Sequence, residues 1–452
     1  MKNYKKVYAA FILAGGLILH GCNGIFDDLA INPNQPSMGA YFTSPSAVND
    51  AVMTMYGYMS TQRCLGASGS KTTIIRSDEA SSNSDYGKPG MFGADLNASY
   101  YTIEQPYTLM YTTASQASYI IETAPSVDFS GNEELRNAYM GEAYFWRAFA
   151  HYYLLINFRN ISPIRQMPRN GDDYVRPLEK PAAVWNFIQE DLAHAKELLP
   201  VKGYWDSKNA GRVTKASAAA LLGKAYLYRS GIEQYYGEDK TTFYSEAAKE
   251  FGDVIDGKYG TYDLTKNYAD NFDVAHENNE ESILEFQFLG DVDNAGFNPG
   301  LATSGLAFDS RGLMLPGAGV GYEGVVHNWL YNAFVNSVDK DGYTDIRMFS
   351  TMIFNDLDAS IHLRNDAGGN PVRLEGPGGY KWEELYPAKN GKEGFATVSN
   401  PLAHSFKAGI RKGIDCSMPT QTEADGTPKL VGVGAGVKEY VYNQPRAHGV
   451  NW

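Results

Sequence analysis

The sequence is poor in cysteine, in basic charge and in long hydrophobic runs. Its 452 residues include three cysteines, too few for a disulfide scaffold. Asp and Glu number 52 against 39 Lys and Arg, a formal net charge of −13, so the chain lacks the basic surface that duplex nucleic-acid binders need. A single long apolar stretch, at the N-terminus, excludes a transporter built from many membrane-spanning helices.

Aromatic residues are abundant instead. The chain has 32 Tyr, 21 Phe and 6 Trp, together 13% of its residues. Tyrosine combines a flat apolar face with a polar tip. This composition favours a surface that holds a ligand by stacking, although it does not place that surface. With 43% hydrophobic and 20% charged residues, the chain as a whole is typical of a globular protein.

The N-terminal segment is predicted to direct export. Lys2, Lys5 and Lys6 precede an apolar stretch from Val7 to Leu19, which is too short to span a bilayer comfortably. The stretch ends in Gly21-Cys22 and resembles a bacterial lipoprotein signal, in which the cysteine is acylated and becomes the mature N-terminus. We therefore expect residues 1–21 to be a signal peptide and Cys22 to be the site of lipid attachment. The alternative is that Cys22 is an ordinary residue near a standard cleavage site.

The other two cysteines leave two alternatives. Cys64 and Cys416 could form a disulfide in an oxidising envelope, or both could be buried free thiols. Their separation in the sequence does not decide between these states.

Apolar residues recur at helical spacing through the middle of the chain. Two adjacent stripes between Glu133 and Phe158 predict a helix that is buried on more than one side. A second helix is predicted from Pro181 to Leu199, closed by Pro200, and a fourth from Thr242 to Ile255. A third helix should begin at the N-cap Thr214 and end at Arg229, with Gly231 just beyond its end.

The third and fourth helices carry half of a tetratricopeptide pattern. Leu222-Gly223-x-x-Tyr226 matches one portion of the repeat and Ala247-x-x-x-Phe251 matches another, across a long turn from Ser230 to Lys240. Helix pairs that bury their faces on one another are therefore favoured, the alternative being ordinary antiparallel helices. Farther on, residues 282–288 read as a strand and residues 326–335 as a short helix, among Gly- and Pro-rich loops. The predicted fold is mainly α, a tetratricopeptide-like helix-pair core with a loop-rich second half containing short strands and helices.

Four blocks of sequence resemble the signatures of the SusD/RagB outer-membrane lipoproteins of Bacteroidetes. They lie in order behind the lipoprotein-like signal. The blocks are Gly141-Glu142-Ala143 with Trp146-Arg147-Ala148; Glu190-Asp191-Leu192 with Leu199-Pro200; Gly211-Arg212-Val213-Thr214-Lys215; and Asn267-Tyr268 followed by Glu280-Glu281-Ser282-Ile283.

The resemblance implies a domain organisation. Residues 22–235 would form a SusD-like N-terminal helical region and residues 236–452 the SusD/RagB C-terminal region. The chain departs from the family pattern in two places. Phe158-Arg159-Asn160-Ile161-Ser162-Pro163 stands where Y-G-D-V-P is usual, and the chain stops at Trp452, before the closing helix that members usually have. We therefore expect a C-terminal truncation and exposed apolar surface on the helical half.

The resemblance also implies a function. Members capture a nutrient, usually a glycan, at the cell surface, and act as a lid over a SusC-like TonB-dependent outer-membrane barrel. We thus expect a lipid-anchored, surface-facing outer-membrane protein with an oligosaccharide or polysaccharide ligand, no nucleic-acid partner and no enzymatic activity. Two alternatives remain: a peptide-binding member of the same scaffold, and a surface glycosidase, because the separation of a carboxylate pair is a spatial fact.

Glycan binders need exposed aromatic planes edged by polar groups. Three segments of the chain have that mixture of residues, and each aromatic could instead pack in the core. The ligand-binding candidates are Tyr86, Phe92, Asn97, Tyr100, Tyr101, Phe297, Asn298, Asp309, Arg311, Tyr322, Trp329, Tyr331, Tyr380 and Trp382.

No cofactor is expected. The segment His276-Glu277-Asn278-Asn279-Glu280 lacks the second histidine of a zinc site. Calcium is faintly indicated by Asp291-x-Asp293 and by Asp339-x-Asp341-Gly342, neither of which completes a calcium loop.

Overall fold

The computed structural model describes the helical half of the chain and short stretches beyond it. The described residues are 42–61, 64–65, 80–82, 99, 101–168, 175–266, 268–272, 276–287, 323–326, 330, 333–334, 336–342, 345, 347, 430–434 and 437–440. The predicted signal peptide, Cys22, Cys416 and the last residues before Trp452 lie outside this set. The division at residues 235/236 and the truncation remain predictions.

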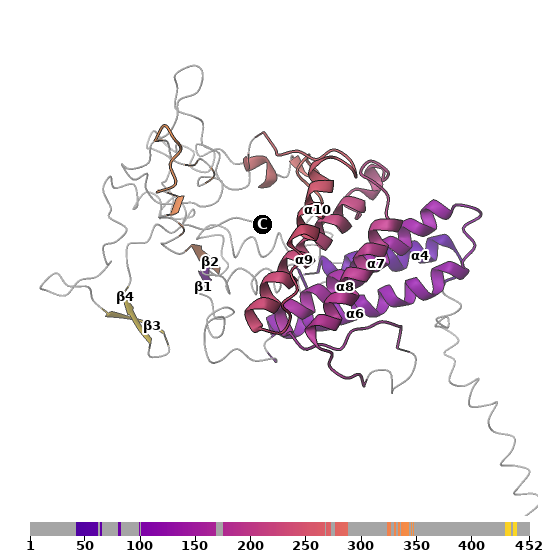
Figure 1. Ribbon diagram of the computed structural model, residues 1–452, viewed down its shortest axis with the longest axis horizontal. Helices are drawn as coiled ribbons and strands as arrows, with labels where there is room; N and C mark the ends of the chain where they lie inside the picture. Colours follow the sequence, from indigo (N-terminus) through magenta and orange to yellow (C-terminus); the bar gives the residue numbers. More distant parts are fainter. Residues whose placement is uncertain are drawn as a thin grey trace, which may run out of the picture.

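Six α-helices in this described part lie side by side (Figure 1). They are α4 (Pro45–Met59), α6 (Tyr101–Thr123), α7 (Glu133–Phe158), α8 (Pro181–Leu198), α9 (Lys215–Tyr236) and α10 (Tyr244–Ile255). From α6 onward each helix packs mainly on the next, and α4 packs on α6 and α7. The mainly α helix-pair fold predicted from the sequence is confirmed.

Short elements complete the described structure. The 3₁₀ helices are η1 (Ala124–Ser126), η3 (Ser207–Asn209) and η4 (Tyr268–Phe272). Strand β1 (Ala80–Ser82) pairs antiparallel with β2 (Glu323–Val326), and β3 (Leu430–Gly434) pairs antiparallel with β4 (Val437–Tyr440).

Helix α7 is the centre of the core. Asn132 caps it by accepting a hydrogen bond from the backbone N–H of Leu135, and two acidic residues occupy its first turn, where the helix dipole favours negative charge. Residues of both predicted stripes, Phe145 and Trp146 among them, are buried. The helix runs over the predicted residues 133–158 because it is enclosed by α4, α6 and α8.

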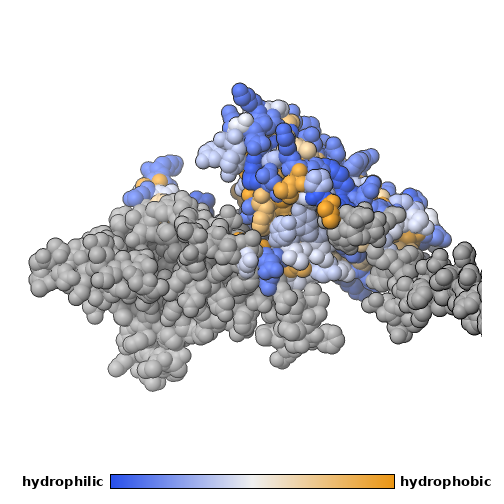
Figure 2. All heavy atoms as spheres, turned by 90° about the horizontal axis from the view of Figure 1, so that it is seen from below, coloured by the Kyte–Doolittle hydropathy of each residue, from blue (hydrophilic) through white to orange (hydrophobic). Residues whose placement is uncertain are grey.

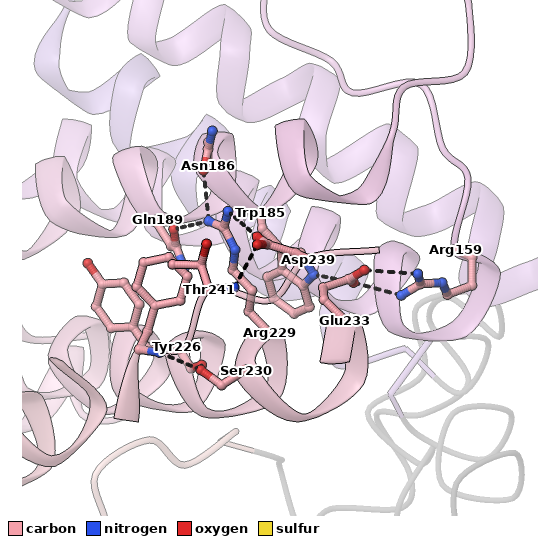
Figure 3. A network of polar contacts seen from close by, with 11 residues as sticks. Arg159, Trp185, Asn186, Gln189, Tyr226, Arg229, Ser230, Glu233, Asp239 and Thr241 are labelled. Atoms are coloured by element: carbon pink, nitrogen blue, oxygen red, sulfur yellow. Dashed lines mark hydrogen bonds and ion pairs between the residues drawn. The ribbon is translucent and has the colours of Figure 1, made fainter. Parts of the chain in front are cut away.

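The predicted end of the third helix is wrong. Its start is confirmed, since Thr214 and Ser217 form a capping box, but α9 continues through Gly231 to Tyr236 and ends at Gly237 with a φ of 70°. A glycine inside a helix costs only about 1 kcal/mol. In the last turn of α9, Glu233 is buried and its carboxylate accepts hydrogen bonds from Arg159 and from the indole of Trp185 (Figure 3).

Arg159 replaces the glycine of the family pattern at the end of α7. Its backbone has φ 61° and ψ −74°, a classic γ-turn, in which the Asn160 N–H donates to the Phe158 carbonyl over 2.8 Å. This strained conformation is held by two hydrogen bonds from the guanidinium to Glu233, at 2.7 and 3.0 Å, and by the Tyr236 ring, 4.3 Å away.

Two further predictions for the second half need correction. Residues 282–287 form no strand ladder. Side chains anchor this segment instead: the Ser217 hydroxyl donates to the Ile283 carbonyl over 2.8 Å, and backbone N–H groups bond to Asn279. Val326 ends strand β2 rather than beginning a helix, although the described residues from 330 to 336 are helical.

Cys64 is a free thiol in the core. Burial raises its pKa well above the ordinary value, which keeps the thiol protonated and unreactive.

In the view of Figure 2 the described surface is largely hydrophilic, with small groups of hydrophobic residues among the polar ones. Exposed large side chains on the helices include Leu227, Tyr228, Tyr235, Tyr236 and Ile255. No helix among the described residues is long and apolar enough to cross a bilayer.

The tetratricopeptide-like pairing of α9 and α10 depends on a close approach at Gly223. A Cβ atom built there would lie 2.8 Å from the Phe251 ring. We expect Gly223→Ala to destabilise the protein by about 1–3 kcal/mol, because the ring must move. The measurement is the free energy of unfolding in urea.

Gly252→Ala is the matched control. Gly252 also lies in a helix, α10, but nothing is within 4 Å of its Cβ position. This substitution should stabilise the protein by about 0.5–1 kcal/mol. A similar change in stability for both variants would contradict the proposed packing.

Candidate functional site

A buried ion pair fixes the loop that precedes α9. The Nη2 atom of Arg212 lies 2.7 Å from Oε1 of Glu142, and the Nε atom donates to the same carboxylate over 3.1 Å. Glu142 is fully buried and Arg212 is 6% exposed. The aromatic rings of Tyr139 and Trp205 lie 5.0 and 4.3 Å from the guanidinium carbon. The pair therefore joins α7 to the loop inside an aromatic enclosure.

Tyr56 of α4 extends this network. Its hydroxyl donates to Oε2 of Glu142 over 2.6 Å and accepts from the Val213 N–H over 2.8 Å. Although burial by itself lowers the pKa of Arg212, the Glu142 carboxylate raises it above its ordinary value. Arg212 remains a cation, and α4, α7 and the loop are held at one point.

A second buried pair links α7 to α8. The Nε and Nη2 atoms of Arg147 bond to the two carboxylate oxygens of Asp191 over 2.7 and 2.8 Å. Glu142 and Arg147 belong to one signature block, and their partners belong to two other blocks. These four motif residues therefore join α7 to α8 and to the loop before α9.

A pocket of about 230 Å³ lies directly beside the Glu142–Arg212 pair. It forms between the loop 202–214, the segment 278–285 and Tyr262, and is lined by polar groups and two aromatic rings. The lining residues include Lys202, Trp205, Asp206, Ser207, Asn209, Ala210, Gly211, Arg212, Tyr262, Asn278, Ser282 and Glu285.

Gly211 allows a close approach between the loop 202–214 and the segment 278–285, which form the first and second walls of the pocket. Its φ is 80°, and a Cβ atom there would lie 2.6 Å from the Gln287 side chain and 2.7 Å from the Glu285 carbonyl. A residue with a side chain would be strained and would push the second wall away. The backbone conformation and the close contacts thus explain why the G-R-x-T motif has glycine at position 211.

The ligand-binding residues predicted from the sequence are not tested by this structure. Tyr101 begins helix α6, but its side chain is not among those that the structure describes. The remaining thirteen candidates also lie outside the described residues, so the structure neither brings them together nor separates them.

None of the pocket residues is among the ligand-binding candidates predicted from the sequence, although Gly211, Arg212 and Ser282 lie in the signature blocks. Trp205, Asp206 and Asn209 have the same aromatic and polar mixture that guided the choice of the other segments. The second wall lies about seventy residues farther along the chain, and no local pattern joins the two.

No group of three or more His, Cys, Asp or Glu side chains lies together as metal ligands would in the part of the chain that is described. The calcium suggestion remains untested.

Comparisons with known proteins agree with this scaffold. Residues 31–227 match a SusD-like family model described as "Starch-binding associating with outer membrane". A SusD-like protein of Bacteroides ovatus is 26% identical over 293 residues, which cover 64% of this chain and 51% of that protein. The chain thus spans about half the length of this curated relative.

Two solved structures share the fold. A SusD superfamily protein of Bacteroides vulgatus has a TM-score of 0.55 at 22% identity, covering 70% of this chain and 62% of that one. A structure described as a laminarin-binding SusD-like protein has a TM-score of 0.52 at 22% identity, covering 69% and 67%.

The buried pair can be tested by removing one or both partners. Arg212→Met leaves the Glu142 carboxylate buried without its cation, and we expect a loss of about 3–5 kcal/mol in the free energy of unfolding. The double variant Glu142→Leu/Arg212→Met should recover much of that loss, because no buried charge remains. A double-mutant cycle by urea unfolding measures both.

Arg136→Ala is the control, since Arg136 pairs with Glu133 on the outside of α7. It should cost less than about 1 kcal/mol. If Arg212→Met lowers the free energy of unfolding no more than this control does, the buried pair does not have the structural role assigned to it.

Proposed function

We propose that the chain is a SusD/RagB-type protein that binds a glycan at the outer membrane and delivers it to a partner TonB-dependent barrel. The observation that carries the proposal is the match of residues 31–227 to a starch-binding, outer-membrane-associated family. The buried pairs Glu142–Arg212 and Arg147–Asp191 support it, since they join the signature blocks into one scaffold.

The proposed ligand class is a polysaccharide or its oligosaccharides. A protein with this fold is described as laminarin-binding, which supports a glycan over a peptide. The described pocket adds hydroxyl, amide and carboxylate groups beside aromatic rings, which suits a polyhydroxylated ligand.

We propose further that Cys22 carries the lipid anchor and that the protein faces the cell exterior as the lid of a SusC-like transporter. The role is binding and transfer, without chemistry on the glycan. Two or more acyl chains on one cysteine would hold the protein firmly at the membrane, since each buried methylene contributes about 0.8 kcal/mol.

Retention on immobilised ligands tests the ligand class. The purified chain should be retained by at least one of starch, laminarin or another neutral polysaccharide, and pass through a column of immobilised peptides. Retention by peptides alone would overturn the glycan assignment in favour of the peptide-binding alternative. Reducing sugars should not be released during the incubation; release that a single Asp or Glu substitution abolishes would identify a glycosidase.

Expression of the lipoprotein in its native host tests the anchor and the partner. The wild-type protein should fractionate with the outer membrane and co-purify with a TonB-dependent barrel. Cys22→Ala should move the protein to the soluble fraction while its thermal unfolding stays unchanged, because Cys22 precedes the folded helices. Membrane fractionation of Cys22→Ala equal to the wild type would exclude lipid attachment at this residue, and absence of any barrel in the wild-type complex would count against the lid.

A further inference from the structure

The pocket beside the start of α9 has the size of one sugar ring. Its volume of about 230 Å³ corresponds to roughly eight water molecules at about 30 Å³ each. Sites for larger organic ligands begin near about 300 Å³. A single sugar residue, at a chain end or at a branch, is small enough to enter it.

The floor of this pocket is fixed before any ligand arrives. Arg212 is more than nine-tenths buried, and its guanidinium is held by Glu142, by Asn49 at 2.8 Å and by Asn209 at 3.1 Å. The close approach at Gly211 sets the distance between the two walls. A ligand therefore meets a preorganised surface and does not have to order it.

The charges around the pocket disfavour an anionic ligand. Arg212 is neutralised by Glu142, which leaves one ammonium group, on Lys202, and two carboxylates, on Asp206 and Glu285. A uronate or sulfate group would gain one attraction and face two repulsions at short range. Among the described residues, Lys202 has no carboxylate within 4 Å; its Nζ atom lies 4.0 Å from the centre of the Tyr262 ring.

Hydroxyl recognition matches the hydrogen-bonding groups that remain. Oε2 of Glu285 accepts from the Ser282 hydroxyl over 2.6 Å and from the Asn278 N–H over 2.9 Å, whereas Oε1 has no partner in the part of the chain that is described. Cations cover one face of each aromatic ring, Arg212 on Trp205 and Lys202 on Tyr262. Stacking on each ring is therefore restricted to the opposite face, and the polar groups of the lining supply hydrogen bonds beside it.

We propose that this pocket binds one uncharged sugar residue, at a chain end or branch of the captured glycan. The carboxylates of Asp206 and Glu285 accept hydrogen bonds from its hydroxyl groups, and the ammonium of Lys202 donates to its oxygens. The inference rests on the proposed function, since it assumes that the ligand is a glycan.

A variant that fills the pocket tests this inference. Ala210 lines the pocket and is exposed, so Ala210→Trp occupies it without touching the core. Ala183→Trp places the same side chain on the exposed surface of α8 and is the matched control. Titration calorimetry with neutral trisaccharides of glucose, mannose, galactose and xylose should give at least one binder. Its affinity should fall by about tenfold or more in Ala210→Trp and stay unchanged in Ala183→Trp.

The outcomes separate the two proposals. If neither neutral polysaccharides nor trisaccharides bind the wild type, the proposed function fails. If polysaccharides are retained but no trisaccharide binds, or if Ala210→Trp binds as the wild type does, the pocket inference alone is overturned. Binding of the tripeptide Ala-Ala-Ala that Ala210→Trp abolishes would also overturn it, in favour of a peptide subsite.

An anionic trisaccharide tests the role of the two carboxylates. Trigalacturonate should bind the wild type about tenfold more weakly than the best neutral trisaccharide. The double variant Asp206→Asn/Glu285→Gln removes both negative charges and should reduce the difference in affinity between the two trisaccharides. An unchanged difference would contradict the assigned role of these carboxylates.

Discussion

The ion pair between Glu142 and Arg212 is the constraint on which the described structure depends. Both groups are removed from water, so each is tolerated only because the other is present. Through Tyr56 and Val213 the pair also fixes helix α4 and the entry to α9. The position of the loop 202–214, and with it the floor of the pocket, follows from one interaction in the core. Scaffold and candidate binding site are therefore not independent parts of this molecule.

The residues by which the sequence resembles the SusD/RagB family are chiefly residues that hold the scaffold together. Glu142, Arg147, Asp191 and Arg212 pair with one another, and Gly223 admits the ring of Phe251. Such motifs identify a fold but do not encode a ligand. The pocket combines motif residues such as Arg212 with residues outside the motifs, such as Lys202, Asp206 and Glu285, on loops that the scaffold positions.

The sequence was most informative where apolar periodicity and capping agreed. Helix α7 follows its predicted bounds because Asn132 caps its start and two stripes are buried. The sequence pattern predicts that the third helix ends at Arg229, before Gly231, because a local glycine signal cannot show that Glu233, one turn farther on, is paired with Arg159 and Trp185. The partial alternation of residues 282–288 predicts a strand, whereas side-chain anchors decide the path of the described residues 282–287. The pocket could not be predicted, since its walls come from segments that only the fold brings together; the loop aromatics chosen from composition remain predictions.

The Glu233 carboxylate has a consequence for how the helices unfold. In stacked helix pairs each unit normally contacts its immediate neighbours, so that one end can melt while the other persists. Here a single buried side chain on α9 bonds both to Trp185 of α8 and to Arg159 at the end of α7, which is two helices away (Figure 3). If α9 unfolds, Arg159 loses the contacts that hold its strained turn. Unfolding of α9 therefore also destabilises the end of α7, which favours all-or-none unfolding of the helices over fraying.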